Sequence, residues 1–198
     1  MKNYILIIAA IALAATAGCK KDDDGDYGVN TFNRTITGQV VNGDPAIKKV
    51  EASIIGETIA TGSYSNGGFT ITLPERLNSS VCDKITESTF EGATFSDKNA
   101  MIAKIMTFDC YDGTGKFAGD LWYQTDETME SDFASFVYTD RNVTVNGKHL
   151  YYSTEYNNLI LKKGWNIVYS KQTAQGKSVE SNQEISGLKW YLDTWYVQ

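Results

Sequence analysis

Hydrophobic and polar residues alternate at every second position through most of the chain from Arg34 onward. In residues 50–54 the hydrophobic positions are Val, Ala and Ile, and in residues 69–73 they are Phe, Ile and Leu. A period of two places one set of side chains on the buried face of a sheet and the other in water. No stretch keeps a helical period. The sequence therefore predicts an all-β fold, an antiparallel β-sandwich that is extended or partly barrel-like.

Short turns rich in Gly and Asn separate the alternating segments, and connections this short predict that successive strands pair with each other. A long strand is expected over 101–111, and a type I′ hairpin is expected to join 143–145 to 150–152. Residues 75–99 are polar without clear alternation, so a sub-domain boundary, if the body has one, is predicted there. The predicted turns are Asn66–Gly68, Asp112–Gly115, Asn146–Gly147 and Lys163–Gly164.

The composition limits the classes of function. The chain has 198 residues, 42% of them hydrophobic, and a net charge of -6. A chain of this size buries enough surface to form a core. A pI near 4.8 argues against a nucleic-acid partner, because phosphate backbones are bound by clustered Lys and Arg. His149 is the single histidine of the sequence, which excludes a multi-histidine metal centre, and no cofactor is expected.

The first 18 residues are predicted to be a signal peptide. Lys2 supplies a positive start, and residues 4–15 are apolar but shorter than the roughly 20 residues of a membrane-spanning helix. The following residues, Thr16–Cys19, resemble a bacterial lipobox, with Thr16 where that motif prefers Leu. The resemblance implies that Cys19 is lipidated. Ordinary secretion is the alternative, because Ala15–Ala17 also fits an A-x-A cleavage site.

An acidic tract, Lys20–Asp24, follows this cysteine. It resembles the tract after the lipidated cysteine in surface-exported lipoproteins of Bacteroidetes. The resemblance implies a lipid-anchored protein of the bacterial outer membrane, displayed on the cell surface. The alternative location is secreted or periplasmic. The alternative explanation of the tract itself is a solvated run of charges. Residues 19–33 are predicted to be a flexible tether to a body of residues 34–198.

The start of the body carries a second resemblance. Thr37–Val40, Val50–Ala52, Gly62 and the run Asn66–Pro74 resemble the prealbumin-like or carboxypeptidase-regulatory-like module of secreted Bacteroidetes proteins. The resemblance implies a small Greek-key sandwich for this part, and says little about function. The rest of the body is similar to uncharacterised surface lipoproteins of the same bacteria, from which no activity carries over.

Cys82 and Cys110 form an even pair in an oxidising compartment. A disulfide between them would close a long loop and contribute about 3–4 kcal/mol through chain entropy. Two buried thiols, acting as small hydrophobic residues, are the alternative. Both alternatives are structural, because no histidine lies near either cysteine in the sequence.

The sequence lacks the motifs of common enzymes, so no catalytic residue and no metal ligand are expected. His149 follows a predicted turn, where a solvent-exposed residue is usual. Two carboxylates would suffice for a glycoside hydrolase, but the sequence does not show their separation. Acidic clusters invite a calcium interpretation, and solvated loops are the favoured explanation because neither cluster fits the EF-hand spacing. These clusters are Asp126, Glu127, Glu130 and Asp132, and separately Asp109 and Asp112.

The aromatic residues of the C-terminal segment are the remaining candidates for binding. In an extended strand Tyr191, Asp193 and Trp195 face one way, opposite Trp190. If that side is exposed, its aromatic rings and carboxylate would suit stacking against sugar rings. The alternative is that aromatic residues pack both sides of the sandwich. A second group, at 151–156, contains three tyrosines and has the same two interpretations.

Together these features predict a non-enzymatic surface lipoprotein that acts as a binding or accessory module. Its ligand would be extracellular, such as a glycan or a partner surface protein, and its contact with the membrane would be the lipid anchor. A pilus or fimbrial subunit is the first alternative, because an exposed sheet edge can accept a donated strand. A carboxylate-based glycoside hydrolase is the second.

Overall fold

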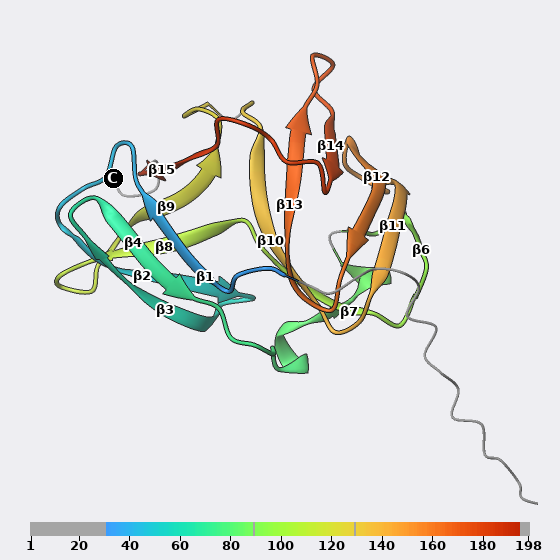
Figure 1. The fold of residues 1–198 in the computed structure, drawn as a ribbon, viewed down its shortest axis with the longest axis horizontal. Coiled ribbons are helices and arrows are strands. Elements are labelled where there is room, and N and C mark those ends of the chain that lie inside the picture. The colour runs from blue at the N-terminus through green and yellow to red at the C-terminus, as the bar shows by residue number, and fades with distance from the viewer. Residues whose placement is uncertain (1–30, 89, 129, 195–198) are drawn as a thin grey trace, which may run out of the picture.

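The computed structural model describes residues 31–88, 90–128 and 130–194 and confirms the all-β prediction. Fifteen strands form one open mixed sheet, which does not close into a barrel (Figure 1). The helical elements of the described residues are two 3-10 turns, η1 (Ser79–Val81) and η2 (Ile85–Glu87). The strands are β1 (Thr35–Gln39), β2 (Ile47–Ile54), β3 (Glu57–Ser65), β4 (Gly68–Thr72), β5 (Asp83–Lys84), β6 (Thr94–Phe95), β7 (Met101–Ile105), β8 (Thr107–Asp112), β9 (Phe117–Gln124), β10 (Phe133–Thr139), β11 (Val143–Lys148), β12 (Thr154–Leu161), β13 (Gly164–Gln172), β14 (Ser178–Ser181) and β15 (Lys189–Asp193).

The first half of the sheet runs in the order β1-β4-β3-β2-β8-β9, with β15 on the other side of β9. These pairs are antiparallel. The half curls until Val40, directly after β1, forms a bridge with Trp190 in β15. Its inward faces share a hydrophobic core that we call the first core, which includes Val50, Ala52, Phe69, Phe108, Leu121, Phe136 and Trp190.

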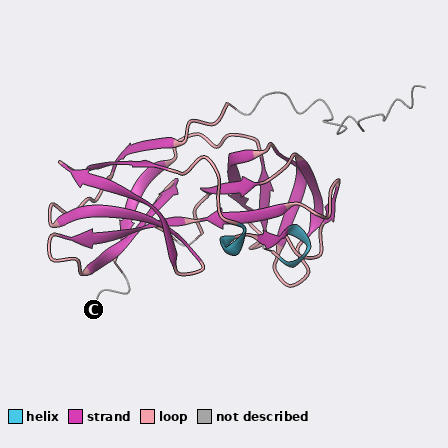
Figure 2. Ribbon diagram, turned by 90° about the horizontal axis from the view of Figure 1, so that it is seen from below, coloured by secondary structure: helices cyan, strands magenta, loops and turns pink. Residues whose placement is uncertain are grey.

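The second half continues as β10-β13-β14-β12-β11-β6, with β7 and then β5 beyond β10. Here β14 is parallel to β12 and antiparallel to β13. Figure 2 shows the strands of the two halves as two neighbouring groups, with the 3-10 turns in cyan. The second core lies inside this half and includes Ile85, Phe90, Ile102, Val137, Val145, Leu159, Leu161 and Val168.

Strands β10 and β13 form a wall common to both cores, and they stand in the middle of Figure 1. Phe136 and Tyr138 belong to the first core, whereas Val137 between them belongs to the second. In β13, Trp165 belongs to the first core and Val168 to the second. A strand buried on both faces needs hydrophobic residues at successive positions, which explains why β10 does not alternate with polar residues.

Two of the predicted hairpins are present and two are wrong. Asn66–Gly67 joins β3 to β4 with φ of 52° and 72°, as a type I′ turn requires, and Asp112–Gly115 joins β8 to β9. Gly147 lies instead at a bulge inside β11, and the chain turns at 149–153. The turn at Lys163–Gly164 joins β12 to β13, but these strands do not pair because β14 lies between them.

The strand predicted over 101–111 is two strands. β7 pairs with β10 of the second half, whereas β8 pairs with β2 and β9 of the first half. Met106, between them, is 41% exposed. The chain therefore crosses from one half to the other at Met106.

Residues 75–99 carry the chain in the opposite direction, from the first half to the second. They contain η1, β5, η2 and β6. Val81 and Cys82 pack in the first core, whereas Ile85 and Phe90 pack in the second. Core membership thus changes within this polar stretch, between Cys82 and Ile85.

The described part of the chain begins at Thr31, so the predicted signal peptide, Cys19 and tether residues 19–30 lie outside it. At the start of the body, the backbone N–H of Leu73 donates to the carbonyl of Arg34 at 2.9 Å. Among the residues that the structure describes, no helix has the length and apolar character needed to cross a membrane.

Candidate functional site

Four carboxylates from four neighbouring strands lie in a row on the outer face of the first half. The register pairs Glu51 of β2 with Asp109 of β8. It also pairs Asp109 with Asp120 of β9, and Asp120 with Asp193 of β15. Directly opposed residues of antiparallel strands share a face, with Cβ atoms about 5 Å apart. We call these four residues the carboxylate row.

The alternation within each strand explains why these residues face outward. Their neighbours Val50, Cys110, Leu121 and Leu192 are buried in the first core. Because successive side chains of a strand point to opposite faces, burial of these neighbours turns the acidic residues away from the core.

Aromatic side chains flank the carboxylate row on both sides. On one side Trp122 of β9 is paired with Tyr191 of β15, and on the other Tyr111 of β8 is paired with Phe117 of β9. The rings of Tyr111 and Phe117 meet edge to face at 5.9 Å. Trp122, Tyr111 and Phe117 are half-buried, so part of each ring faces solvent. The face thus presents an aromatic row, an acidic row and a second aromatic row.

Polar and basic neighbours hold two of the carboxylates. Ser53 Oγ donates to Asp109 Oδ2 at 2.8 Å. Lys49 Nζ lies 2.8 Å from Glu51 Oε1 and 4.3 Å from the centre of the Tyr111 ring. A basic side chain therefore neutralises one end of the row, whereas two carboxyls face each other in its middle.

Asp120, in the middle of the row, holds a proton more strongly than an ordinary carboxylate. Partial burial, the charge of Asp109, a hydrogen bond with Asp109 and the charge of Asp193 raise the pKa of Asp120 to about 6. Two carboxyls at one site resist ionising together. Like charges directly opposite each other also destabilise a sheet. The row is therefore a place where the sequence departs from what folding alone favours.

Replacing Asp120 by Asn is expected to stabilise the protein at neutral and alkaline pH but not in acid. Folded Asp120 keeps its proton up to about pH 6, whereas the unfolded chain releases it near 3.8. The stability contributed by the protonated form is complete below about pH 4 and is lost as the pH rises through 6. We expect Asp120→Asn to gain about 1–2 kcal/mol at about pH 8, allowing for solvent screening, and nothing near pH 4. Urea unfolding of both proteins measures the difference in stability. Equal gains in stability at both pH values would contradict the raised pKa of Asp120.

The predicted ligand-binding residues Tyr191 and Asp193 both lie on this face, whereas Trp195 lies outside the described residues. Tyr191 is only 9% exposed, and its hydroxyl donates to the carbonyl of Thr125 at 3.4 Å. Trp190 is buried on the opposite face, so aromatic residues of β15 pack on both sides of the sheet. Tyr191 is therefore a packed residue with little surface for a ligand, and the half-exposed rings of the face belong to other strands.

The second predicted aromatic group is divided between surface and core. Tyr151 and Tyr152 are 72% and 70% exposed at the turn between β11 and β12, whereas Tyr156 is buried in the second core. His149 Nδ1 accepts the backbone N–H of Tyr151 at 3.0 Å and of Tyr152 at 3.3 Å. His149 therefore shapes this turn.

Cys82 and Cys110 are free, buried thiols, which corrects the disulfide alternative. Cys110 points into the first core from the middle of β8, and Cys82 lies at the end of η1 with Asp140 and Asp83 as its charged neighbours. Burial, followed by nearby carboxylates, raises the pKa of Cys82 to about 11 and of Cys110 to about 12. Both thiols thus contribute as hydrophobic core residues.

Neither thiol is expected to react in the folded protein. Because the thiolate is the reactive form and burial suppresses it, iodoacetamide should label Cys82 and Cys110 only after unfolding. Peptide mass spectrometry with and without urea measures the labelling. A disulfide-linked peptide pair in the unreduced protein would contradict this expectation.

Each of the two acidic clusters with a possible calcium interpretation contains an aspartate that stabilises a turn. Asp112 Oδ1 accepts the hydroxyl of Thr114 at 2.7 Å and the backbone N–H of Lys116 at 3.0 Å. Asp126 Oδ1 accepts the hydroxyl and the backbone N–H of Thr128. The hydroxyl bonds, followed by the backbone bonds, lower the pKa of both aspartates. Within the described ranges, no three His, Cys, Asp or Glu side chains come together in a way that could hold a metal ion.

Comparison with protein-family models, curated proteins and solved structures gave no match to the chain. Local sequence patterns single out Asp109 beside Asp112, and Asp193 beside Tyr191, but they miss Asp120. In the sequence, Asp120 could have been found as the polar residue before the buried Leu121. Its place opposite Asp109, however, depends on strand register.

Proposed function

We propose that the protein is a lipid-anchored cell-surface protein that binds a neutral glycan on the outer face of β2, β8, β9 and β15, without acting as an enzyme. The observation that carries the proposal is the carboxylate row between two rows of aromatic rings. Residues 35–74, which contain β1 to β4, are proposed to be its prealbumin-like or carboxypeptidase-regulatory-like part.

The chemistry of this face suits a sugar chain. Sugar hydroxyls donate hydrogen bonds, and ionised carboxylates accept them strongly. The C–H faces of a sugar ring are apolar and pack against half-exposed rings such as Trp122 and Tyr111. Glu51 and Asp193 stand three strand spacings apart, about 14 Å, so the row is long enough for more than one sugar ring.

A glycoside hydrolase is the second candidate, and the raised pKa of Asp120 favours it. Such enzymes hold their two carboxyls about 5–9.5 Å apart, with substrate between them. Asp109 and Asp120 share a hydrogen bond and are too close. Asp109 and Asp193 stand two strands apart, about 9.5 Å, but Asp120 occupies the space between them. This arrangement supports binding without hydrolysis.

A glycan array probed with the purified protein tests the binding function. We expect neutral glycans to bind, and Trp122→Ala to weaken them by about fivefold or more through loss of ring contact. The matched control is the double variant Tyr151→Ala, Tyr152→Ala, which removes exposed aromatic rings at the distant turn. If the control loses binding and Trp122→Ala does not, the site is at the turn and the proposal is wrong. Cleaved sugar products would favour the hydrolase.

The membrane-anchor part of the proposal rests on the sequence around Cys19. Mass spectrometry of the mature N-terminus is expected to find Cys19 as the first residue, carrying lipid chains. Several acyl chains hold a protein on a membrane almost permanently, at about 0.8 kcal/mol per buried methylene. An unmodified chain that begins at Gly18 would instead indicate ordinary secretion.

A further inference from the structure

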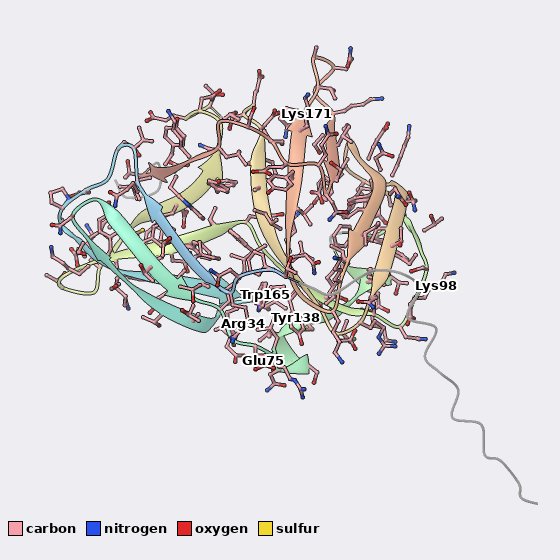
Figure 3. The ribbon with its side chains drawn as sticks, in the orientation of Figure 1. Arg34, Glu75, Lys98, Tyr138, Trp165 and Lys171 are labelled. Atoms are coloured by element: carbon pink, nitrogen blue, oxygen red, sulfur yellow. The ribbon has the colours of Figure 1, made fainter. Side chains whose placement is uncertain are left out.

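A cavity of about 480 Å³ opens where the first half of the sheet meets the second. This volume is typical of small-ligand sites, which often form between packed units. Figure 3 shows Arg34, Glu75, Tyr138 and Trp165 gathered at this junction although they are distant in the sequence. We call the cavity the seam pocket; the residues that line it and matter most are Phe32, Arg34, Arg76, Tyr138, Lys163 and Trp165.

The seam pocket is basic although the whole chain has a net charge of -6. Its acidic residues are Glu75 and Asp140. Asp140 is paired with Arg141, whose Nη2 lies 2.9 Å from its Oδ2 and whose Nη1 also contacts Asp97, and the N–H of Met101 donates to Oδ1 of Asp140. Burial opposes ionisation of Asp140, but these bonds outweigh it and lower its pKa. The lining thus carries three basic side chains and two carboxylates, and Asp140 has Arg141 as its own partner.

Arg34 is held in position with most of its donors unused. Its Nη1 donates to the carbonyl of Leu73 at 2.8 Å, which fixes the guanidinium at the pocket wall. A guanidinium has five N–H donors. Among the described residues, no other protein acceptor and no carboxylate partner is bonded to Arg34. A fixed guanidinium with free donors suits two-pronged binding of a carboxylate.

Tyr138 adds a hydroxyl to the lining of the seam pocket. It is 7% exposed and lines the pocket, and within the described chain its hydroxyl makes no hydrogen bond to protein. The hydroxyl atom is not fully enclosed, so it faces the solvent of the pocket and is available to a ligand. The Nε1–H of the neighbouring Trp165 donates to the carbonyl of Pro74 at 2.8 Å, and the Trp165 ring packs edge to face against Tyr138. With half-buried Phe32, it gives the pocket an apolar side.

We propose that the seam pocket binds a uronic acid, a sugar ring that carries a carboxylate. The carboxylate would bind to Arg34, with Arg76 and Lys163 nearby, and a ring hydroxyl would bind to Tyr138. The C–H face of the sugar would pack on the apolar side. This site is separate from the carboxylate row, whose negative charge repels such a ligand. The inference therefore does not depend on the proposed glycan-binding face.

Calorimetric titration of the purified protein with glucuronic acid, glucose and glucose 6-sulfate tests the inference. We expect glucuronic acid to bind at least about tenfold more tightly than glucose, because the carboxylate makes charge-assisted bonds. Arg34→Gln is expected to remove this preference, and Tyr138→Phe to weaken both sugars. Lys171→Gln is the matched control: it also removes one positive charge, at the opposite end of β13 (Figure 3), and should leave binding unchanged.

Equal binding of glucose and glucuronic acid, or an Arg34→Gln protein with unchanged affinity, would overturn the inference. Preference for the sulfate ester would also overturn it. If Arg34→Gln does not fold, the variants Arg76→Gln and Tyr138→Phe decide, since within the described chain neither of these side chains makes a hydrogen bond to another segment. Failure of the pocket and failure of the glycan-binding face are distinguishable, because Arg34→Gln tests only the seam pocket and Trp122→Ala tests only the outer face.

Discussion

Replacing Lys104 by Met is expected to destabilise the protein by about 3–5 kcal/mol, because it leaves the carboxylate of Glu180 buried and unpaired. Lys104 Nζ lies 2.7 Å from Glu180 Oε1, and the two side chains are 9% and 7% exposed. Phe90 lies 6.0 Å from the ammonium, within the second core. Chemical unfolding at neutral pH measures the loss. The exposed pair of Lys148 and Glu155 provides the control, where removal of the lysine should change the stability little.

The double variant Lys104→Met, Glu180→Leu is expected to recover the lost stability. The pair is incompletely satisfied, because Glu180 Oε2 is buried without a hydrogen-bond partner in the described structure. An incompletely bonded buried pair is often no more stable than hydrophobic residues of similar size. We expect the double variant to come within about 1 kcal/mol of the original protein. If it is as unstable as the single variant, the buried charge is not the cause.

The same pair explains why β14 could not be predicted. Its sequence, Ser-Val-Glu-Ser, turns Glu180 inward where a hydrophobic residue is expected. The alternation found in β2 and β4 depends only on a core on one side of the strand and is visible in the sequence. An inward carboxylate is intelligible only with its partner, which stands on β7.

The failed hairpin at Asn146–Gly147 shows a second limit, strand register. A tight turn there would have placed residues 150–152 opposite the start of β11. The observed turn places Leu159 opposite Val145 and Leu161 opposite Val143, all fully buried. Burial of these leucines in the second core outweighs the local turn preference.

Register also limits what the sequence says about the candidate site. Alternation within one segment correctly places Tyr191 and Asp193 on one face. Their neighbours Asp120 and Asp109 come from other segments, and only the pairing of β15, β9 and β8 brings them together. The burial of Tyr191 was also beyond local patterns, because its hydroxyl reaches Thr125 in the loop after β9.

Replacing Trp190 by Ala is expected to destabilise the protein by about 3–5 kcal/mol, because Trp190 joins four aromatic rings in the first core. Its ring lies 4.8 Å from those of Phe69 and Tyr123, 5.5 Å from Phe108 and 6.2 Å from Phe136. Urea unfolding measures the loss. Trp122→Ala, on the outer face, should cost much less, because that ring is half-exposed and leaves no closed cavity.

A second substitution tests whether the cavity is the cause of that loss. Gly38 lies against Trp190, and a Cβ there would overlap Cδ1 of the indole. Gly38→Ala alone should therefore destabilise the protein, because the buried indole has no room to move. In the Trp190→Ala background the overlap is gone. There, Gly38→Ala should destabilise the protein by at least about 1 kcal/mol less than it does when Trp190 is present. Equal costs of Gly38→Ala in both backgrounds would show that the indole does not fill this space.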